Sequence, residues 1–137
     1  MDVIGLHHVG FVVRRIGPVL SRMVDEGATV LVEPVDDPIQ RVTVALLMTD
    51  GITPVELVAP IEGLDSPIES RLKRGGGLDH FCYTVPSVGD ALAHESELGG
   101  LVVCEPVHAV AFNRQVGFIQ RRSGLIVEFI SQAEVPA

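Results

Sequence analysis

The chain has little positive charge. Ten lysine and arginine residues stand against 18 aspartate and glutamate residues in a total of 137, so the formal net charge is −8. Lys73 is the only lysine. A protein that follows a phosphate backbone needs clustered basic residues, and we therefore expect no nucleic-acid partner.

Long apolar runs and cysteine pairs are also missing. No stretch approaches the roughly 18 apolar residues of a membrane span, so we expect no membrane partner. The first residues lack the basic and apolar regions of a signal peptide. Two cysteines, Cys82 and Cys104, do not make a disulfide framework. We expect a cytoplasmic protein in which both thiols are buried small apolar residues.

The composition that is present suits a folded domain. Hydrophobic residues make up 47% of the chain and charged residues 20%, which is enough apolar material for a sizeable core. The length lies in the usual range for one domain. We therefore expect a single domain over residues 1–137.

The chain repeats itself at a constant offset of 72 residues. Between residues 5–58 and 77–130, 14 of 54 positions are identical without a gap. Unrelated segments of ordinary composition would share roughly 4. The matches include Gly5-Leu6 with Gly77-Leu78, Glu33-Pro34-Val35 with Glu105-Pro106-Val107, and Val55-Glu56 with Val127-Glu128. We infer two copies of one module, module 1 over about residues 5–60 and module 2 over about 77–132.

Each module has the pattern of one strand, one helix and three more strands. Alternating residues predict the first strand, and Pro18 suits the first turn of a helix that Gly27 ends. In module 2, Ser87 is the expected cap of a helix that closes at Gly99. The predicted strands cover residues 7–13, 30–32, 42–48, 55–59, 81–85, 101–104, 115–119 and 125–130.

A linking helix is predicted over about residues 66–75. Ser66 is placed to cap it, Pro67 fits its first turn, and Glu69 completes a capping box. Glycines at 75–77 end it. The expected order is therefore module, connector helix, module.

Two repeated polar pairs are not explained by folding. They are His8 with His80 and Glu56 with Glu128, and each lies in a strand otherwise built from apolar residues. A glutamate there is costly to bury unless it is paired or bound to a metal. The alternative for each residue alone is a solvent-facing glutamate or a satisfied histidine. Because two related modules can bring equivalent positions together, we expect the four side chains to converge on one point.

Two imidazoles and two carboxylates suit one divalent ion such as Zn²⁺, Co²⁺, Ni²⁺, Mn²⁺ or Fe²⁺. The two carboxylates make the ligand set neutral around the ion, and open positions remain for water or a chelating substrate. Ala45 and Gly117, a repeated pair of small residues, are expected to leave room for a ligand. The alternative is that they only allow the strands to curve.

The chain resembles the vicinal oxygen chelate superfamily, which contains glyoxalase I, methylmalonyl-CoA epimerase, extradiol dioxygenases and antibiotic-resistance proteins. The resemblance covers nearly the whole chain. Its carriers are Leu6-His7-His8-Val9-Gly10, Val55-Glu56-Leu57-Val58-Ala59-Pro60, Ser66-Pro67-Ile68, Gly77-Leu78-Asp79-His80-Phe81 and Leu125-Ile126-Val127-Glu128-Phe129. Their combination looks most like the methylmalonyl-CoA epimerase branch.

The resemblance implies an α+β fold in which tandem βαβββ modules form a partly open eight-stranded barrel-like sheet around a metal. The family's ligand positions fall on His8, Glu56, His80 and Glu128. Four ligands favour redox-neutral proton transfer over the three-ligand iron chemistry of the dioxygenases. The implied function is a metal-dependent isomerase or epimerase that acts through an enolate. The alternatives are a glyoxalase I-type lyase and a non-catalytic metal-binding or small-molecule-binding protein.

The residue that would carry the proton differs from the one in some epimerases. These epimerases share the pattern Gln40-x-Val42 but carry a glutamate on the third strand. The stretch Gln40-Arg41-Val42-Thr43-Val44 has no acid, so the catalytic base falls to Glu56 or Glu128. Gln40 is a candidate substrate contact through this resemblance.

Asn113 and Arg114 are further candidates for binding a substrate carboxylate, and the alternative is an arginine in solvent. The implied partners are a small acid or acyl-CoA thioester and a second copy of the chain in a homodimer. Three cations could meet a phosphate, or could only favour a helix C-terminus: Arg71, Lys73 and Arg74. The remaining histidines are expected to be bystanders, with His7 on the opposite strand face, His94 on a helix and His108 in a loop.

Overall fold

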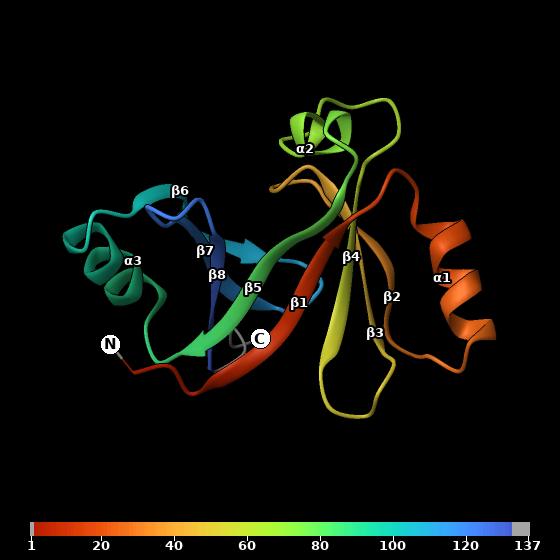
Figure 1. Cartoon of the computed structure of the whole chain (residues 1–137), viewed down its shortest axis with the longest axis horizontal. Coiled ribbons are helices and arrows are strands. Elements are labelled where there is room, and N and C mark those ends of the chain that lie inside the picture. The colour runs from red at the N-terminus through yellow and green to blue at the C-terminus, as the bar shows by residue number, and fades with distance from the viewer. Residues whose placement is uncertain (1, 133–137) are drawn as a thin grey trace. The chain divides into compact units, whose positions relative to one another are not determined.

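The computed structural model describes residues 2–132 (Figure 1). It contains two compact units, one of residues 8–79 and the other of residues 2–7 with residues 80–132. Within the described residues, no helix has both the length and the apolar character that crossing a membrane requires.

The unit of residues 8–79 holds four strands of a mixed eight-stranded sheet. These strands have the order β2-β3-β4-β1, and β1 runs parallel to β4 while the other neighbours are antiparallel. Helix α1 packs on β2, β3 and β4. The elements are β1 (Gly5–Val12), α1 (Ile16–Asp25), β2 (Thr29–Asp37), β3 (Val42–Met48), β4 (Pro54–Pro60) and α2 (Glu69–Lys73).

The second unit repeats this arrangement with the other four strands of the eight-stranded sheet. The order is β5-β8-β7-β6, with β5 parallel to β8, and α3 packs on β6, β7 and β8. The elements are β5 (Gly77–Val85), α3 (Val88–Glu97), β6 (Leu101–Ala109), β7 (Arg114–Gln120) and β8 (Ile126–Ser131).

The duplication predicted from the sequence is confirmed by the element bounds. Every element of module 2 begins 72 residues after its counterpart, from β1 and β5 at Gly5 and Gly77 to β4 and β8 at Pro54 and Ile126. The fold class is therefore α+β, with two tandem βαβββ modules and eight strands.

The helix ends follow the residues that the sequence singled out. Gly27 and Gly99 have φ of 105° and 91°, the left-handed conformation in which glycine avoids a steric penalty. After each glycine, the next backbone N–H returns to the helix: Ala28 donates to Met23 at 2.9 Å, and the corresponding bond in α3 is 2.8 Å. Ser87 caps α3 by accepting a 3.2 Å hydrogen bond from the Asp90 N–H, as predicted.

Strands β2 and β6 are longer than the sequence indicated. Pro34 and Pro106 lie inside them, although proline cannot donate to a strand ladder. Both strands have a single neighbour in their sheet, and both have register shifts at the prolines, between Val32 and Val35 and between Cys104 and Val107. Edge strands and bulges are the places where a sheet tolerates proline.

The connector helix is shorter than predicted, since α2 covers Glu69–Lys73 rather than residues 66–75. Its N-cap is Ile68, which makes no side-chain cap. Ser66 instead closes a local turn, in which its hydroxyl oxygen accepts from the Ile68 N–H at 3.5 Å. The predicted capping box is wrong because the chain turns once before the helix begins.

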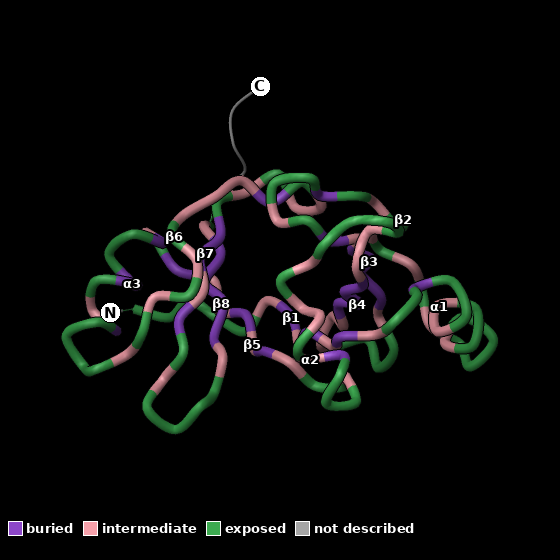
Figure 2. Tube along the Cα trace, turned by 90° about the horizontal axis from the view of Figure 1, so that it is seen from above, coloured by how far each residue is buried: buried purple, intermediate pink, exposed green. Residues whose placement is uncertain are grey.

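The four strands of each unit have a helix-covered face and an opposite face, and buried residues follow the middle strands (Figure 2). The expectation that Ala45 and Gly117 leave room for a ligand is wrong, because both lie on the helix-covered face. Ala45 packs in the cluster of Ile16 and Leu57 under α1. A Cβ on Gly117 would lie 2.9 Å from methyl carbons of Leu92 and Val88. These small residues let the helices approach their sheets.

The substitution Gly117→Ala should therefore destabilise the fold by about 1–2 kcal/mol, because the α3 side chains must give way. Urea unfolding followed by circular dichroism measures the change. Gly89→Ala is the matched control, since a Cβ at Gly89 meets nothing within 4 Å and alanine is the better helix former. Equal stability of both variants would contradict the close approach of α3.

Candidate functional site

The first candidate pair, His8 and Glu56, lies on neighbouring parallel strands. Glu56 of β4 pairs with Gly10 of β1, and His8 lies two residues before Gly10 on the same strand face. His8 Nε2 is 3.4 Å from Glu56 Oε1, and the two side chains are 0% and 5% exposed. Strand register and alternation thus place both polar groups on the face of the sheet that α1 does not cover.

The second pair, His80 and Glu128, repeats this geometry in module 2. Glu128 of β8 pairs with Cys82 of β5, two residues after His80. His80 Nε2 is 3.2 Å from Glu128 Oε1, and both side chains are 3% exposed. The ring of Phe118 contacts His80 edge-on, with ring centroids 5.4 Å apart. This aromatic contact restricts the orientation of the imidazole.

The distances within each pair fit a metal-binding role. Imidazole nitrogen and carboxylate oxygen bind a divalent ion such as zinc at about 2.0–2.2 Å, so two adjacent ligands of one ion lie about 3.0–3.5 Å apart. The observed 3.4 Å and 3.2 Å lie in this range. A buried carboxylate also requires a compensating group, which an ion or the imidazole itself supplies. Each module therefore presents one nitrogen and one oxygen ligand, buried and correctly spaced.

Gln40, the candidate substrate contact, belongs to the turn between β2 and β3. Its side-chain amide donates to Asp37 Oδ2 at 2.9 Å, and its backbone N–H donates to Asp37 Oδ1 at 3.0 Å. Asp37 itself is 1% exposed. The amide nitrogen of Gln40 thus stabilises the turn, a structural role that sequence reasoning missed.

Asn113 and Arg114 lie in the corresponding turn between β6 and β7. Asn113 has φ of 51°, as its counterpart Arg41 has φ of 59°, so both positions adopt the left-handed turn conformation. Arg114 begins β7 on the same strand face as Phe118. Four residues of strand separate them by about 13 Å. Arg114 therefore shares the face of the His80–Glu128 pair but lies toward the end of the strand.

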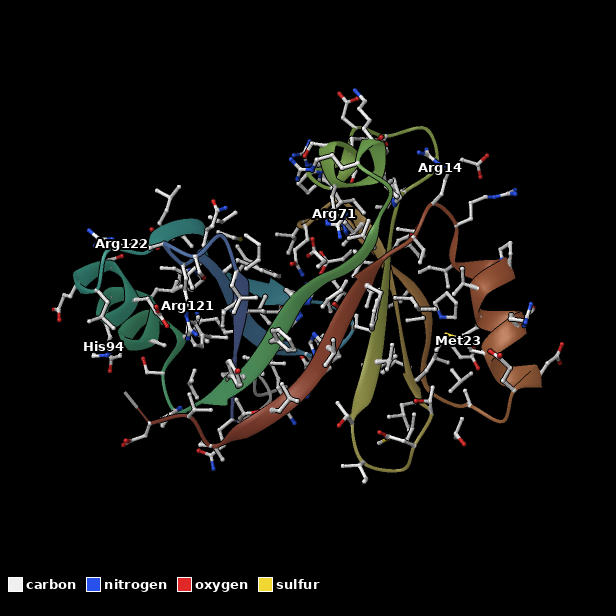
Figure 3. All side chains as sticks on the ribbon, viewed as in Figure 1. Arg14, Met23, Arg71, His94, Arg121 and Arg122 are labelled. Carbon is white, nitrogen blue, oxygen red and sulfur yellow. The ribbon has the colours of Figure 1, made fainter. Side chains whose placement is uncertain are left out.

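The three basic candidate residues lie in α2 and directly after it. The Arg71 guanidinium donates to the Leu78 carbonyl oxygen at 2.6 Å and lies 4.0 Å from Asp79 (Figure 3). It thereby ties α2 to the start of β5, while Lys73 and Arg74 are exposed.

The remaining histidines lie outside the two pairs. His7 packs edge-on against Phe112, with ring centroids 5.2 Å apart, and His94 lies on α3 as expected. The loop predicted for His108 is wrong, because this residue lies in β6 opposite Gln115.

Cys104 is a neighbour of the second pair that sequence reasoning missed. It is half-buried rather than buried, whereas Cys82 is fully buried as expected. Burial raises the pKa of the Cys104 thiol, and the negative charges of Glu128 and Glu105 raise it further. The repeat carries no signal for this thiol, because its counterpart in module 1 is Val32.

Alkylation of Cys104 by iodoacetamide should therefore titrate with an apparent pKa above the usual value of about 8.5. Glu128→Gln removes a negative charge, so the labelling rate of Cys104 at a given pH should rise. Mass spectrometry of labelled peptides measures both rates. Cys104→Ser is the control and should leave almost no labelling, because Cys82 is 0% exposed. An unchanged pH dependence of Cys104 labelling in Glu128→Gln would contradict the effect of the Glu128 charge on the thiol pKa.

Comparison with family models gives one match. The model described as the glyoxalase/bleomycin resistance protein/dioxygenase superfamily matches residues 7–118. This range contains His8, Glu56 and His80, while Glu128 lies beyond it. Comparison with curated proteins gives no match.

Solved structures share the fold over almost the whole chain. A hypothetical protein from Bacillus halodurans is 29% identical with a TM-score of 0.79, and the alignment covers 96% of each chain. Methylmalonyl-CoA epimerase from Mycobacterium tuberculosis is 25% identical with a TM-score of 0.81, covering 98% of this chain and 90% of that one. A variant Streptomyces coelicolor methylmalonyl-CoA epimerase, in complex with 2-nitronate-propionyl-CoA, is 20% identical with a TM-score of 0.81, covering 96% and 99%.

Proposed function

Because the chain belongs to the glyoxalase/bleomycin resistance protein/dioxygenase superfamily, we propose that it is a divalent-metal-dependent epimerase or isomerase. In this proposal it moves a proton at the carbon beside a carbonyl group of a small acid or acyl-CoA thioester. The observation that carries the proposal is the buried histidine–glutamate pair repeated in both modules. The likeness to methylmalonyl-CoA epimerases supports it, since one of these relatives is a complex with an acyl-CoA compound.

We assign four ligands to one ion: His8, Glu56, His80 and Glu128. Two carboxylates and two neutral imidazoles balance a doubly charged cation, and this donor set suits Zn, Co, Ni, Mn or Fe. When bound, the ion supplies a Lewis acid that stabilises negative charge developing on a substrate oxygen. Metal analysis of the purified protein tests the assignment: one ion per chain supports a shared site, and two ions per chain would contradict it.

The protein groups have separate tasks in this proposal. The imidazoles remain neutral ligands, and Phe118 holds the ring of His80 by its edge contact. Glu56 or Glu128 accepts the substrate proton and returns it, because β3 carries no acid, whereas some epimerases have a glutamate on their third strand. Arg114 and Asn113 would bind a carboxylate group of the substrate. Gln40, which lies in the equivalent turn of module 1, would be a further substrate contact.

Deuterium wash-in from solvent tests the reaction. Metal-loaded protein is incubated in deuterium oxide with methylmalonyl-CoA, and exchange at the carbon beside the thioester is measured by mass spectrometry. Metal-stripped protein is the control. Exchange that requires the ion supports the proposal, and no exchange with methylmalonyl-CoA or related acyl thioesters would overturn it.

A glyoxalase I-type lyase is the second candidate, favoured by the missing acid on β3, which leaves metal-proximal glutamates as the base. Wash-in of deuterium into hemithioacetal product, without exchange in acyl thioesters, would support it. Absence of exchange in both would favour a binding protein without catalysis. We also propose a homodimer, which light scattering of the purified protein tests.

A further inference from the structure

The unit of residues 8–79 contains a cavity of about 570 Å³ on the helix-covered face of its sheet. Its walls come from α1, β1, β4 and α2, and its lining is mostly apolar. Phe11, Val19, Met23, Val55 and Leu72 supply apolar side chains. Figure 3 shows Met23 directed from α1 toward the sheet. The cavity therefore lies on the opposite face of the sheet from His8 and Glu56.

The duplicated module provides an internal comparison, because two residues at the equivalent positions are more buried there. Val19 and Val55 are partly exposed, whereas their counterparts Ala91 and Val127 are 1% and 0% exposed. These two lining residues of the cavity thus have fully buried counterparts in module 2.

Two sequence differences accompany the opening. Side chains of α3 fill the space beside Gly117, whereas its counterpart Ala45 presents a methyl group to the cluster under α1. In module 2, Arg121, which directly follows β7 and is labelled in Figure 3, forms a 2.8 Å ion pair with Glu95 of α3. The counterparts in module 1 are Thr49 and Met23, which form no such link and line the cavity instead.

Of the residues that the structure describes, Arg14 is the only charged one that lines the cavity. It lies in the turn between β1 and α1, where module 2 has Pro86. Among residues 2–132, no carboxylate lies within ion-pair distance of its guanidinium. An apolar cavity with one unbalanced cation at its edge is complementary to a molecule with an apolar body and one anionic group.

We propose that this cavity binds an amphiphilic carboxylate of the medium-chain fatty acid class. The hydrocarbon chain lies between α1 and β4, and the carboxylate binds Arg14. The cavity volume lies within the usual range of small-molecule sites, about 300–1,000 Å³. The connector helix α2 closes one end through Leu72, which is 8% exposed.

Decanoate below its micelle concentration is the probe, and isothermal titration calorimetry measures binding to the full chain. We expect one saturable site with equal affinity in metal-stripped and metal-loaded protein. Decanol, which lacks the anion, should bind at least about tenfold more weakly. Binding that requires the ion would place the carboxylate at the metal and overturn the proposal, as would equal binding of decanol or no saturation by decanoate.

Two pairs of variants locate the ligand. Arg14→Gln should weaken decanoate binding at least about tenfold, whereas Arg15→Gln, one residue farther and outside the cavity, should change it less than twofold. Val19→Phe fills the cavity and should abolish binding. Val24→Phe, on the exposed side of α1, should preserve it.

If the two variants of either pair changed decanoate binding equally, the result would contradict the proposed site. A dimer that Val19→Phe dissociates, with no decanoate binding in the parent chain, would instead identify the occupant as a second copy and overturn the proposal.

Discussion

Replacing Glu128 with glutamine is expected to weaken divalent-ion binding at least about tenfold and to slow deuterium exchange at least about 100-fold. Glutamine keeps the size of the side chain but has no negative charge and cannot accept the substrate proton. The carboxylate is buried 3.2 Å from His80 Nε2, so no exposed acid can replace it at this position. Exchange kinetics and calorimetric titration of metal-stripped protein measure the two effects.

Glu56→Gln is the symmetric variant, and comparison of the two separates ligand from base. Both should lose metal affinity, because the pairs are equivalent in the two modules. At saturating metal, the variant that still lacks exchange identifies the base. Glu33→Gln and Glu105→Gln are matched controls, since this repeated pair of glutamates is exposed on β2 and β6. Unchanged metal content in Glu56→Gln or Glu128→Gln would remove that residue from the site.

The duplication explains why four residues could be singled out from the sequence: His8, Glu56, His80 and Glu128. A polar residue in one apolar strand has several ordinary explanations, but the same residue 72 positions later in the same kind of strand removes most of them. His8 and Glu56 reach each other through strand alternation, which the sequence shows, and through the register of β1 on β4, which only the structure shows. That one ion joins the two pairs stays a prediction.

Features that depend on packing between elements could not be predicted from the sequence. The strands predicted over residues 30–32 and 101–104 stop before Pro34 and Pro106, yet β2 and β6 continue past both prolines because edge strands tolerate a bulge. The expectation that Ala45 and Gly117 leave room for a ligand is wrong, because residue alternation separates the two faces of a strand but does not show which face a helix covers. The cavity under α1 depends on the distance between a helix and a sheet, which no local pattern encodes.

The Arg121–Glu95 ion pair should be the strongest polar contribution to stability in module 2. Glu95 is 6% exposed, and Nε and Nη2 of Arg121 donate to the same carboxylate oxygen at 3.2 Å and 2.8 Å. Arg121→Thr would leave a buried carboxylate without its partner, a change that costs about 3–5 kcal/mol in fully buried pairs. Because the Arg121 side chain is 37% exposed and water can enter, we expect about 2–3 kcal/mol, measured by urea unfolding.

Replacing the glutamate of the pair instead of the arginine should cost less stability, and the replacement is the residue at the equivalent position of module 1. Glu95→Met places the counterpart Met23 in module 2 and removes the buried charge, while Arg121 can turn into solvent. Its cost should stay within about 1 kcal/mol, since replacing a buried ionic group by a packed apolar one is often neutral. The double variant Glu95→Met/Arg121→Thr should therefore recover most of the stability that Arg121→Thr loses. Equal losses in both single variants, or no recovery in the double variant, would show that the pair acts through packing rather than charge.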